Sequence, residues 1–187
     1  MNRTDFTCVG DWALEEQTKP AEFGKSDLGV SARWREFTAQ RAVGDAEELG
    51  GAARDFLSAA MTLGSLSREL RLLIRLAVAN VHRCRYCTAH QRHQLIELGV
   101  LDAKIAAVVA PDSGGLTARE RAAVRFAQAT TIDAGAIPPA VYAEFVAEFT
   151  PQERVEVTIV ASAMGMLNKI NDALRVPLEA EFEELVS

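Results

Sequence analysis

Helix start and stop signals follow one another along most of this chain. Two segments open on a capping box, in which a threonine is followed three residues later by a glutamate: Thr117 to Glu120 and Thr150 to Glu153. After Ser67, apolar residues recur at helical spacing, and no window alternates apolar and polar residues as a half-buried strand does. The sequence therefore predicts an all-α fold.

The expected elements form one helical domain behind an extended arm. Residues 1–30 lack periodicity and predict the arm, while residues 31–187 are enough for one compact domain. We expect helices at residues 46–61 (weak, interrupted by Gly50-Gly51), 67–81, 102–110, 117–131, 141–149 and 151–174. The segment that holds Cys84 is expected to continue the 67–81 helix as far as Leu98, where Gly99 supplies a left-handed stop.

Composition excludes several classes of function. The net charge is −6, and no stripe of lysine and arginine is dense enough to follow a phosphate backbone, so we expect no nucleic-acid partner. The N-terminal residues have no apolar core of a secretory signal, and no apolar stretch is as long as a bilayer span. We therefore expect no membrane partner and a cytoplasmic location.

Cysteine and histidine are concentrated in one short segment. The chain has three residues of each type, and two cysteines and all three histidines fall between residues 82 and 93. The segment contains a Cys-x-x-Cys pair, Cys84 and Cys87, followed by His90. In the cytoplasm such a pair is typical of catalytic, redox or metal sites rather than of structural disulfides.

Helical spacing indicates what the pair can do. Residues three apart on a helix are close enough for Cys84 and Cys87 to form a disulfide, which favours redox cycling because so short a loop adds little stability. If the pair lies in the first turn of its helix, the unpaired N–H groups favour a thiolate. His90, one turn beyond Cys87, can serve as its base.

These side chains also have other interpretations. Cys84, Cys87, His90 and His93 lie too far apart along one helix to converge on a zinc ion, so we expect no metal. Thr88 stands where haem attachment requires a histidine, and no other cofactor is expected. Both thiols can also be ordinary small hydrophobic residues of a helix.

A faint repeat runs through the domain. A shift of 84 residues places Cys84 on Asn168 and Cys87 on Asn171, which is either an internal duplication of a helix–helix unit or coincidence. The two asparagines and Arg175 form a polar stripe along the 151–174 helix. A role in helix packing or a subunit contact is the first interpretation of this stripe, and a role in substrate binding is the second.

These motifs resemble a known family. The run from Arg71 to His90, which ends in Cys-Arg-Tyr-Cys-Thr-Ala-His, is similar to the signature of the alkylhydroperoxidase D-like (AhpD-like) branch of the carboxymuconolactone decarboxylase superfamily. The stretch from Leu116 to Pro177 is similar to the second half of those proteins. The resemblance covers about residues 57–178, and implies an AhpD-like helical domain that assembles as a trimer or hexamer.

The resemblance also implies a thiol peroxidase. Cys87 would attack a peroxide, and Cys84 would resolve the sulfenic acid as a disulfide. The family's relay glutamate and histidine positions are occupied here by Leu72 and Gln91. His90 and, more weakly, Glu69 are the nearest substitutes.

We therefore expect an enzyme, a cytoplasmic peroxidase-like oxidoreductase with catalytic residues Cys84, Cys87, His90 and Glu69. Its partners would be a small-molecule peroxide, a dithiol or protein reductant, and copies of itself, since its apolar helix faces need partners. A helical binding, scaffold or redox-sensing protein is the first alternative. A carboxymuconolactone decarboxylase-type enzyme is the second.

Overall fold

The computed structural model describes residues 47–186, so the predicted arm at residues 1–30 lies outside the described residues. The elements are α2 (Glu47–Thr62), α3 (Arg68–His82), α4 (Arg85–Glu97), α5 (Asp102–Ala107), η2 (Pro111–Ser113), α6 (Ala118–Asp133), α7 (Pro139–Glu148), α8 (Pro151–Ala173) and η3 (Ala180–Val186). The described part of the chain contains no strand, which confirms the all-α prediction. Within it, no helix is both long enough and apolar enough to cross a membrane.

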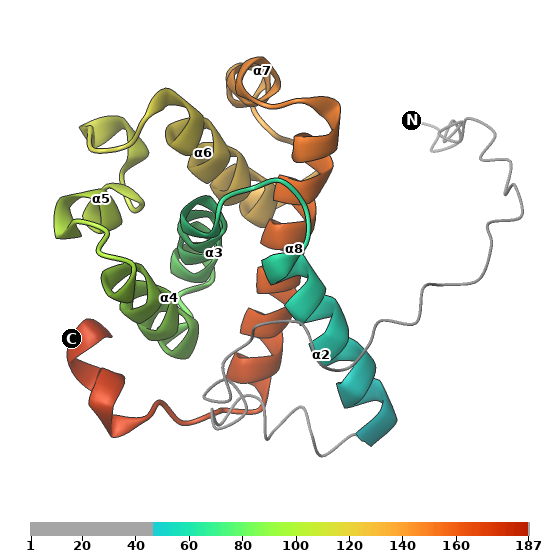
Figure 1. The fold of residues 1–187 in the computed structure, drawn as a ribbon, viewed down its shortest axis with the longest axis vertical. Helices are drawn as coiled ribbons and strands as arrows, with labels where there is room; N and C mark the ends of the chain where they lie inside the picture. The colour runs from blue at the N-terminus through green and yellow to red at the C-terminus, as the bar shows by residue number, and fades with distance from the viewer. Residues whose placement is uncertain (1–46, 187) are drawn as a thin grey trace, which may run out of the picture.

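Helix α3 lies at the centre of the fold (Figure 1) and packs against α4, α6 and α8. Its apolar residues are buried on every side of the helix, as Leu72, Leu73, Ile74 and Val78 show. A helix that is buried on every side needs neighbours on every side, which explains its central place. Ser67 begins it as predicted, because its hydroxyl accepts a hydrogen bond from the Leu70 N–H.

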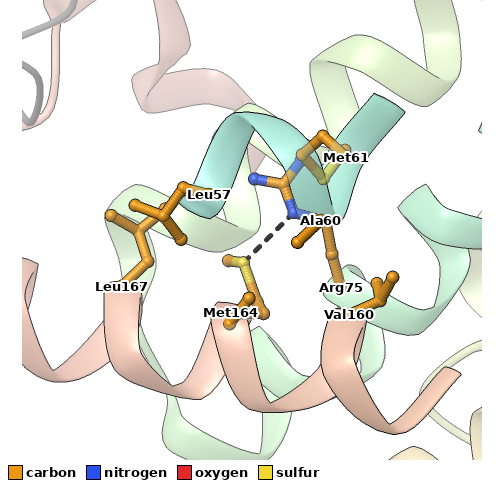
Figure 2. A pocket seen from close by; sticks show the side chains of 8 residues that line it. Leu57, Ala60, Met61, Arg75, Val160, Met164 and Leu167 are labelled. Atoms are coloured by element: carbon orange, nitrogen blue, oxygen red, sulfur yellow. Dashed lines mark hydrogen bonds between the residues drawn. The ribbon is translucent and has the colours of Figure 1, made fainter. Parts of the chain in front are cut away.

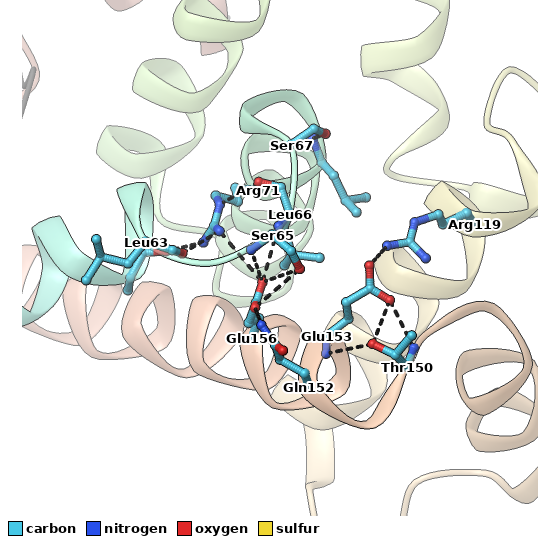
Figure 3. Close-up of polar contacts among 12 residues, drawn as sticks. Leu63, Ser65, Leu66, Ser67, Arg71, Arg119, Thr150, Gln152, Glu153 and Glu156 are labelled. Atoms are coloured by element: carbon cyan, nitrogen blue, oxygen red, sulfur yellow. Dashed lines mark hydrogen bonds and ion pairs between the residues drawn. The ribbon is translucent and has the colours of Figure 1, made fainter.

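Both predicted capping boxes are present. Thr117 begins α6 and Thr150 begins α8, and in each box the threonine and the glutamate exchange hydrogen bonds with each other's backbone. At the start of α8, Glu153 also binds Arg119 of α6, with 2.6 Å between the guanidinium and the carboxylate (Figure 3). The local signal that begins α8 therefore also fixes it against α6.

One carboxylate fixes the turn between α2 and α3 onto α8. The Oε2 atom of Glu156 accepts hydrogen bonds from the N–H groups of Ser65 at 2.8 Å and Leu66 at 3.2 Å (Figure 3). Gly64 has φ +95°, and a Cβ there would lie 2.6 Å from this carboxylate. The turn therefore requires glycine both for its backbone conformation and for space.

The structure corrects three element boundaries. Helix α2 continues through Gly50-Gly51 without the predicted interruption, and α5 ends at Ala107 instead of Ala110. The continuous helix expected from residue 67 to Leu98 is divided, because Arg83 adopts a left-handed conformation (φ 58°) and Cys84 is extended. This break gives α4, the helix that contains Cys87, an N-terminus of its own.

Candidate thiol site

The break before α4 places the cysteine pair at a helix N-terminus. Cys84 is the N-cap residue, and its sulfur accepts a hydrogen bond from the Cys87 N–H at 3.4 Å. Cys87 is the third residue of α4, within the first turn, where unpaired N–H groups and the helix dipole favour an anion. Both thiols are reduced and almost completely buried.

Helix α8 supplies an amide to the same sulfur. The Asn171 carboxamide donates a hydrogen bond from Nδ2 to the Cys87 sulfur at 3.2 Å. Asn168, one turn earlier on α8, is also buried. A packing role or a subunit contact is the first prediction for these asparagines from the sequence. The 84-residue shift that aligns Cys87 with Asn171 is the only sequence pattern that relates the two residues.

The pKa values of the two thiols are shifted in opposite directions. A hydrogen bond from Cys84 lowers the pKa of Cys87, and the amides of Asn171 and Asn168 and the charge of Arg75 lower it further, against the effect of burial. The same hydrogen bond, together with burial, raises the pKa of Cys84. Cys87 therefore loses its proton more readily than Cys84 does.

A buried arginine supplies positive charge near the site. Arg75 of α3 is 3% exposed, and its Nε donates to the Met164 sulfur at 3.4 Å (Figure 2). Burial lowers the pKa of Arg75 to about 10, and the nearby Cys87 opposes this shift, so the guanidinium is charged at pH 7. Arg75 also lines a cavity of about 10 Å³ among Leu57, Met61 and Val160, which holds no more than one water.

His90 is held on the next turn of α4. Its Nε2 lies 3.0 Å from Oε2 of Glu179, and its ring contacts those of Tyr86 and Phe182, with centroids 4.3 Å and 4.6 Å away. Burial lowers the pKa of His90, and the Glu179 carboxylate opposes this effect. Since a carboxylate only accepts, Nε2 carries the hydrogen and Nδ1 is the basic nitrogen.

The C-terminal segment brings this carboxylate to the site. The Tyr86 hydroxyl donates to Oε1 of Glu179 at 3.1 Å, and Arg85 forms an ion pair with Glu183 at 2.9 Å. Phe182 is buried, so the segment lies along α4 beside the C-terminus (Figure 1). The sequence carries no signal for Glu179, because 89 residues separate it from His90 and no motif marks it.

The other expected relay residue lies elsewhere. Glu69 is in the first turn of α3, about 20 Å along the axis from the end that precedes Cys84, and it binds Lys104 at 2.8 Å. The structure therefore does not bring Glu69 to the thiols. Leu72 is fully buried in the core, and Gln91 is buried one turn beyond Cys87.

His93 also lies outside the thiol contacts described above: it pairs with Glu97 on the same helix at 3.3 Å. Among the residues that the structure describes, no group of three or more histidine, cysteine, aspartate or glutamate side chains is arranged to hold a metal ion.

Comparison with known proteins identifies the domain. The model of the carboxymuconolactone decarboxylase family matches residues 47–129, which contain the thiol pair. Residues 47–129 belong to the carboxymuconolactone decarboxylase family. This confirms the resemblance seen in the sequence. No curated protein matches the chain.

Solved structures share the fold of this chain. The debrominase Bmp8 matches with a TM-score of 0.73 at 20% identity, over 79% of this chain and 80% of that one. A protein of unknown function from Agrobacterium tumefaciens, named as a candidate antioxidant defence protein AhpD, matches with a TM-score of 0.68 at 22% identity, over 73% and 95% of the two chains. An uncharacterized peroxidase-related protein from Silicibacter sp. TM1040 matches with a TM-score of 0.69 at 20% identity, over 76% of each chain. The AhpD-like helical fold is confirmed.

Proposed function

We propose that this protein is a thiol-dependent peroxidase-like oxidoreductase in which Cys87 attacks a peroxide and Cys84 resolves the product. The observation that carries the proposal is the asymmetry of the pair. The Cys87 sulfur lies in the first turn of α4 and receives a hydrogen bond from Asn171 at 3.2 Å, while Cys84 caps the helix. The lowered pKa of Cys87 and the raised pKa of Cys84 support these roles as nucleophile and resolving thiol.

The reaction has two balanced steps. The Cys87 thiolate attacks one peroxide oxygen, the S–O bond forms as the O–O bond breaks, and the leaving oxygen takes a proton to give an alcohol or water. The Cys84 thiol then attacks the Cys87 sulfenic acid, forming a disulfide and releasing water. An external dithiol, or a protein that carries one, restores both thiols by exchange.

We assign proton transfer to His90. Its Nδ1 takes the proton that leaves Cys87 and returns it to the leaving oxygen. A helical side chain leans toward the preceding turn, where Cys87 and Tyr86 lie, and the 4.3 Å ring contact with Tyr86 agrees with this direction. Glu179 stabilises the imidazolium that forms during the transfer, so it is a positioning residue for His90.

The test is peroxide consumption with a dithiol reductant. Cys87→Ser should abolish consumption, and Cys84→Ser should stop turnover while leaving a sulfenic acid at Cys87 that dimedone labels. One of the similar structures is a substituted form of the debrominase Bmp8 in complex with 2,3,4-tribromopyrrole. The same assay is therefore repeated with this compound in place of the peroxide, to measure dehalogenation for comparison. A wild-type protein that consumes no hydrogen peroxide, cumene hydroperoxide or tert-butyl hydroperoxide would refute the proposal.

A further inference from the structure

Buried amide groups around Cys87 have more hydrogen-bonding capacity than the protein uses. Both polar atoms of the Asn168 carboxamide, Nδ2 and Oδ1, are buried and have no hydrogen-bond partner within the described residues. The same holds for Oδ1 of Asn171, whose Nδ2 binds the Cys87 sulfur. Buried polar groups in folded proteins are nearly always paired, so each of these atoms needs an explanation.

The three atoms belong to two residues on one face of α8, and one of these residues, Asn171, binds the Cys87 sulfur. Asn168 and Asn171 are three residues apart, which places them on adjacent turns of the same helix face, and each is 1% exposed. Asn171 Nδ2 donates a hydrogen bond to the Cys87 sulfur at 3.2 Å. Asn168 lies near enough for its amide to lower the pKa of Cys87, but neither of its polar atoms reaches the sulfur with hydrogen-bond geometry. The unused atoms therefore comprise one donor and two acceptors beside the nucleophile.

This set complements a hydroperoxide. The terminal O–H of a hydroperoxide donates one hydrogen bond, and both of its oxygens accept. A carboxamide offers a donor and an acceptor side by side, whereas a carboxylate only accepts and an arginine only donates. Water has the same hydrogen-bonding character, but only a peroxide also reacts with the adjacent sulfur.

We propose that Asn168 and Asn171 form the hydroperoxide-binding site of this protein, for hydrogen peroxide or a small alkyl hydroperoxide. Resting on the proposed function, the inference names the substrate contacts of the same thiol. The Oδ1 atoms accept the terminal O–H, and Asn168 Nδ2 donates to the oxygen that leaves. As the S–O bond forms and the O–O bond breaks, negative charge grows on that oxygen, and a preorganised donor stabilises it. The His90 proton then neutralises it.

A purely structural role predicts the opposite effect of mutation. Leucine has nearly the same shape as asparagine, and the wall formed by α3 and α8 here is largely apolar, as Ala163, Met164 and Leu167 show. Replacing unpaired amide atoms by apolar ones removes a desolvation cost, so Asn168→Leu should fold at least as stably as the wild type. A residue that serves binding at the expense of stability can be replaced with no loss of stability but with a loss of function.

The experiment compares two reactions of the same thiolate. The rates of Cys87 with hydrogen peroxide and with tert-butyl hydroperoxide are measured in Asn168→Leu and divided by its rate with iodoacetamide, each corrected for the thiolate fraction at that pH. Iodoacetamide has no leaving oxygen, so its rate reports the thiolate alone. We expect the ratio to fall about 10²-fold, as on losing one oxyanion donor, with an unchanged or higher melting temperature. Asn168→Ser, which keeps one donor and acceptor, should recover part of the ratio.

The control is Ser162→Ala, an exposed position on the same helix, which should leave the ratio unchanged. If the ratio falls further for hydrogen peroxide than for tert-butyl hydroperoxide, the site prefers hydrogen peroxide, and the reverse result indicates an alkyl hydroperoxide. An unchanged ratio in Asn168→Leu, or a large loss of melting temperature in both Asn168→Leu and Asn168→Ala, would overturn the inference. A wild-type protein that reacts with iodoacetamide but with neither peroxide would instead refute the proposed function.

Discussion

The Asn171 amide lies 3.2 Å from the Cys87 sulfur, and the two residues are 84 positions apart in the chain. This separation of 84 residues is also the period of the faint repeat, in which Cys87 corresponds to Asn171 and Cys84 to Asn168. Two residues that the repeat aligns, Cys87 and Asn171, are therefore in direct contact in the folded protein. If the repeat is a true duplication, one copy carries the Cys87 thiol and the other carries the amide that binds it.

Asn171→Ala should raise the pKa of Cys87. The Asn171 N–H stabilises the thiolate, so its loss favours the protonated form and we expect the pKa of Cys87 to rise. The pH dependence of iodoacetamide alkylation, followed by mass spectrometry of the peptide that contains Cys87, measures it. Ser162→Ala is the control, and an unmoved or lowered pKa in Asn171→Ala would contradict the role of the amide.

Glu179→Gln should slow peroxide consumption about threefold to tenfold and move the acid limb of the pH–rate profile to lower pH. Glu179 opposes the effect of burial on His90, so removal of its charge lowers the pKa of His90 further. A base is active when deprotonated, and activity is lost as pH falls through its pKa. The limb therefore shifts downward while the weaker base gives a lower plateau.

The matched control for Glu179 is Glu183→Gln on the same segment. It removes a carboxylate from an exposed ion pair with Arg85, so the rate and the profile should not change. The charges of His93 and Arg75 also act on the pKa of His90, and neither residue is altered by the test. Equal effects of the two substitutions would show that the segment acts only by packing.

Glu156→Ala should lower the free energy of unfolding by about 1–3 kcal/mol without changing thiol reactivity. The substitution leaves the N–H groups of Ser65 and Leu66 without their acceptor in a turn that joins α2 to α3. Urea unfolding followed by circular dichroism measures the loss. Glu148→Ala, at the end of α7, is the comparison, and a similar small change in both variants would contradict the role of Glu156.

The protein should form an oligomer through exposed apolar side chains. Val155 and Ile159 lie one turn apart on α8 and are 59% and 41% exposed, which is unusual for β-branched residues on a solvent-facing helix. Light scattering at micromolar concentration should give a multiple of 20.3 kDa, and Ile159→Lys should shift it toward the monomer. A monomeric wild type would contradict this expectation.

Local signals in the sequence determined the helices and their starts. Thr117, Thr150 and Ser67 each satisfy N–H groups within their own first turn, so a few residues of sequence suffice to place the helix start. The identity of the thiol segment was equally readable, because a Cys-x-x-Cys pair followed by His90 is a contiguous pattern. Contiguous patterns are readable because the residues that interact are neighbours in the chain.

The tertiary structure decided what surrounds the thiols. Arg83 turns left-handed and gives Cys87 a helix N-terminus, but an arginine carries no sequence mark of that conformation. Asn171 and Glu179 reach the site from 84 and 89 residues away, and Glu69 is drawn to Lys104 instead. Such contacts depend on how whole helices pack, which is set by burial summed over the core rather than by any short pattern.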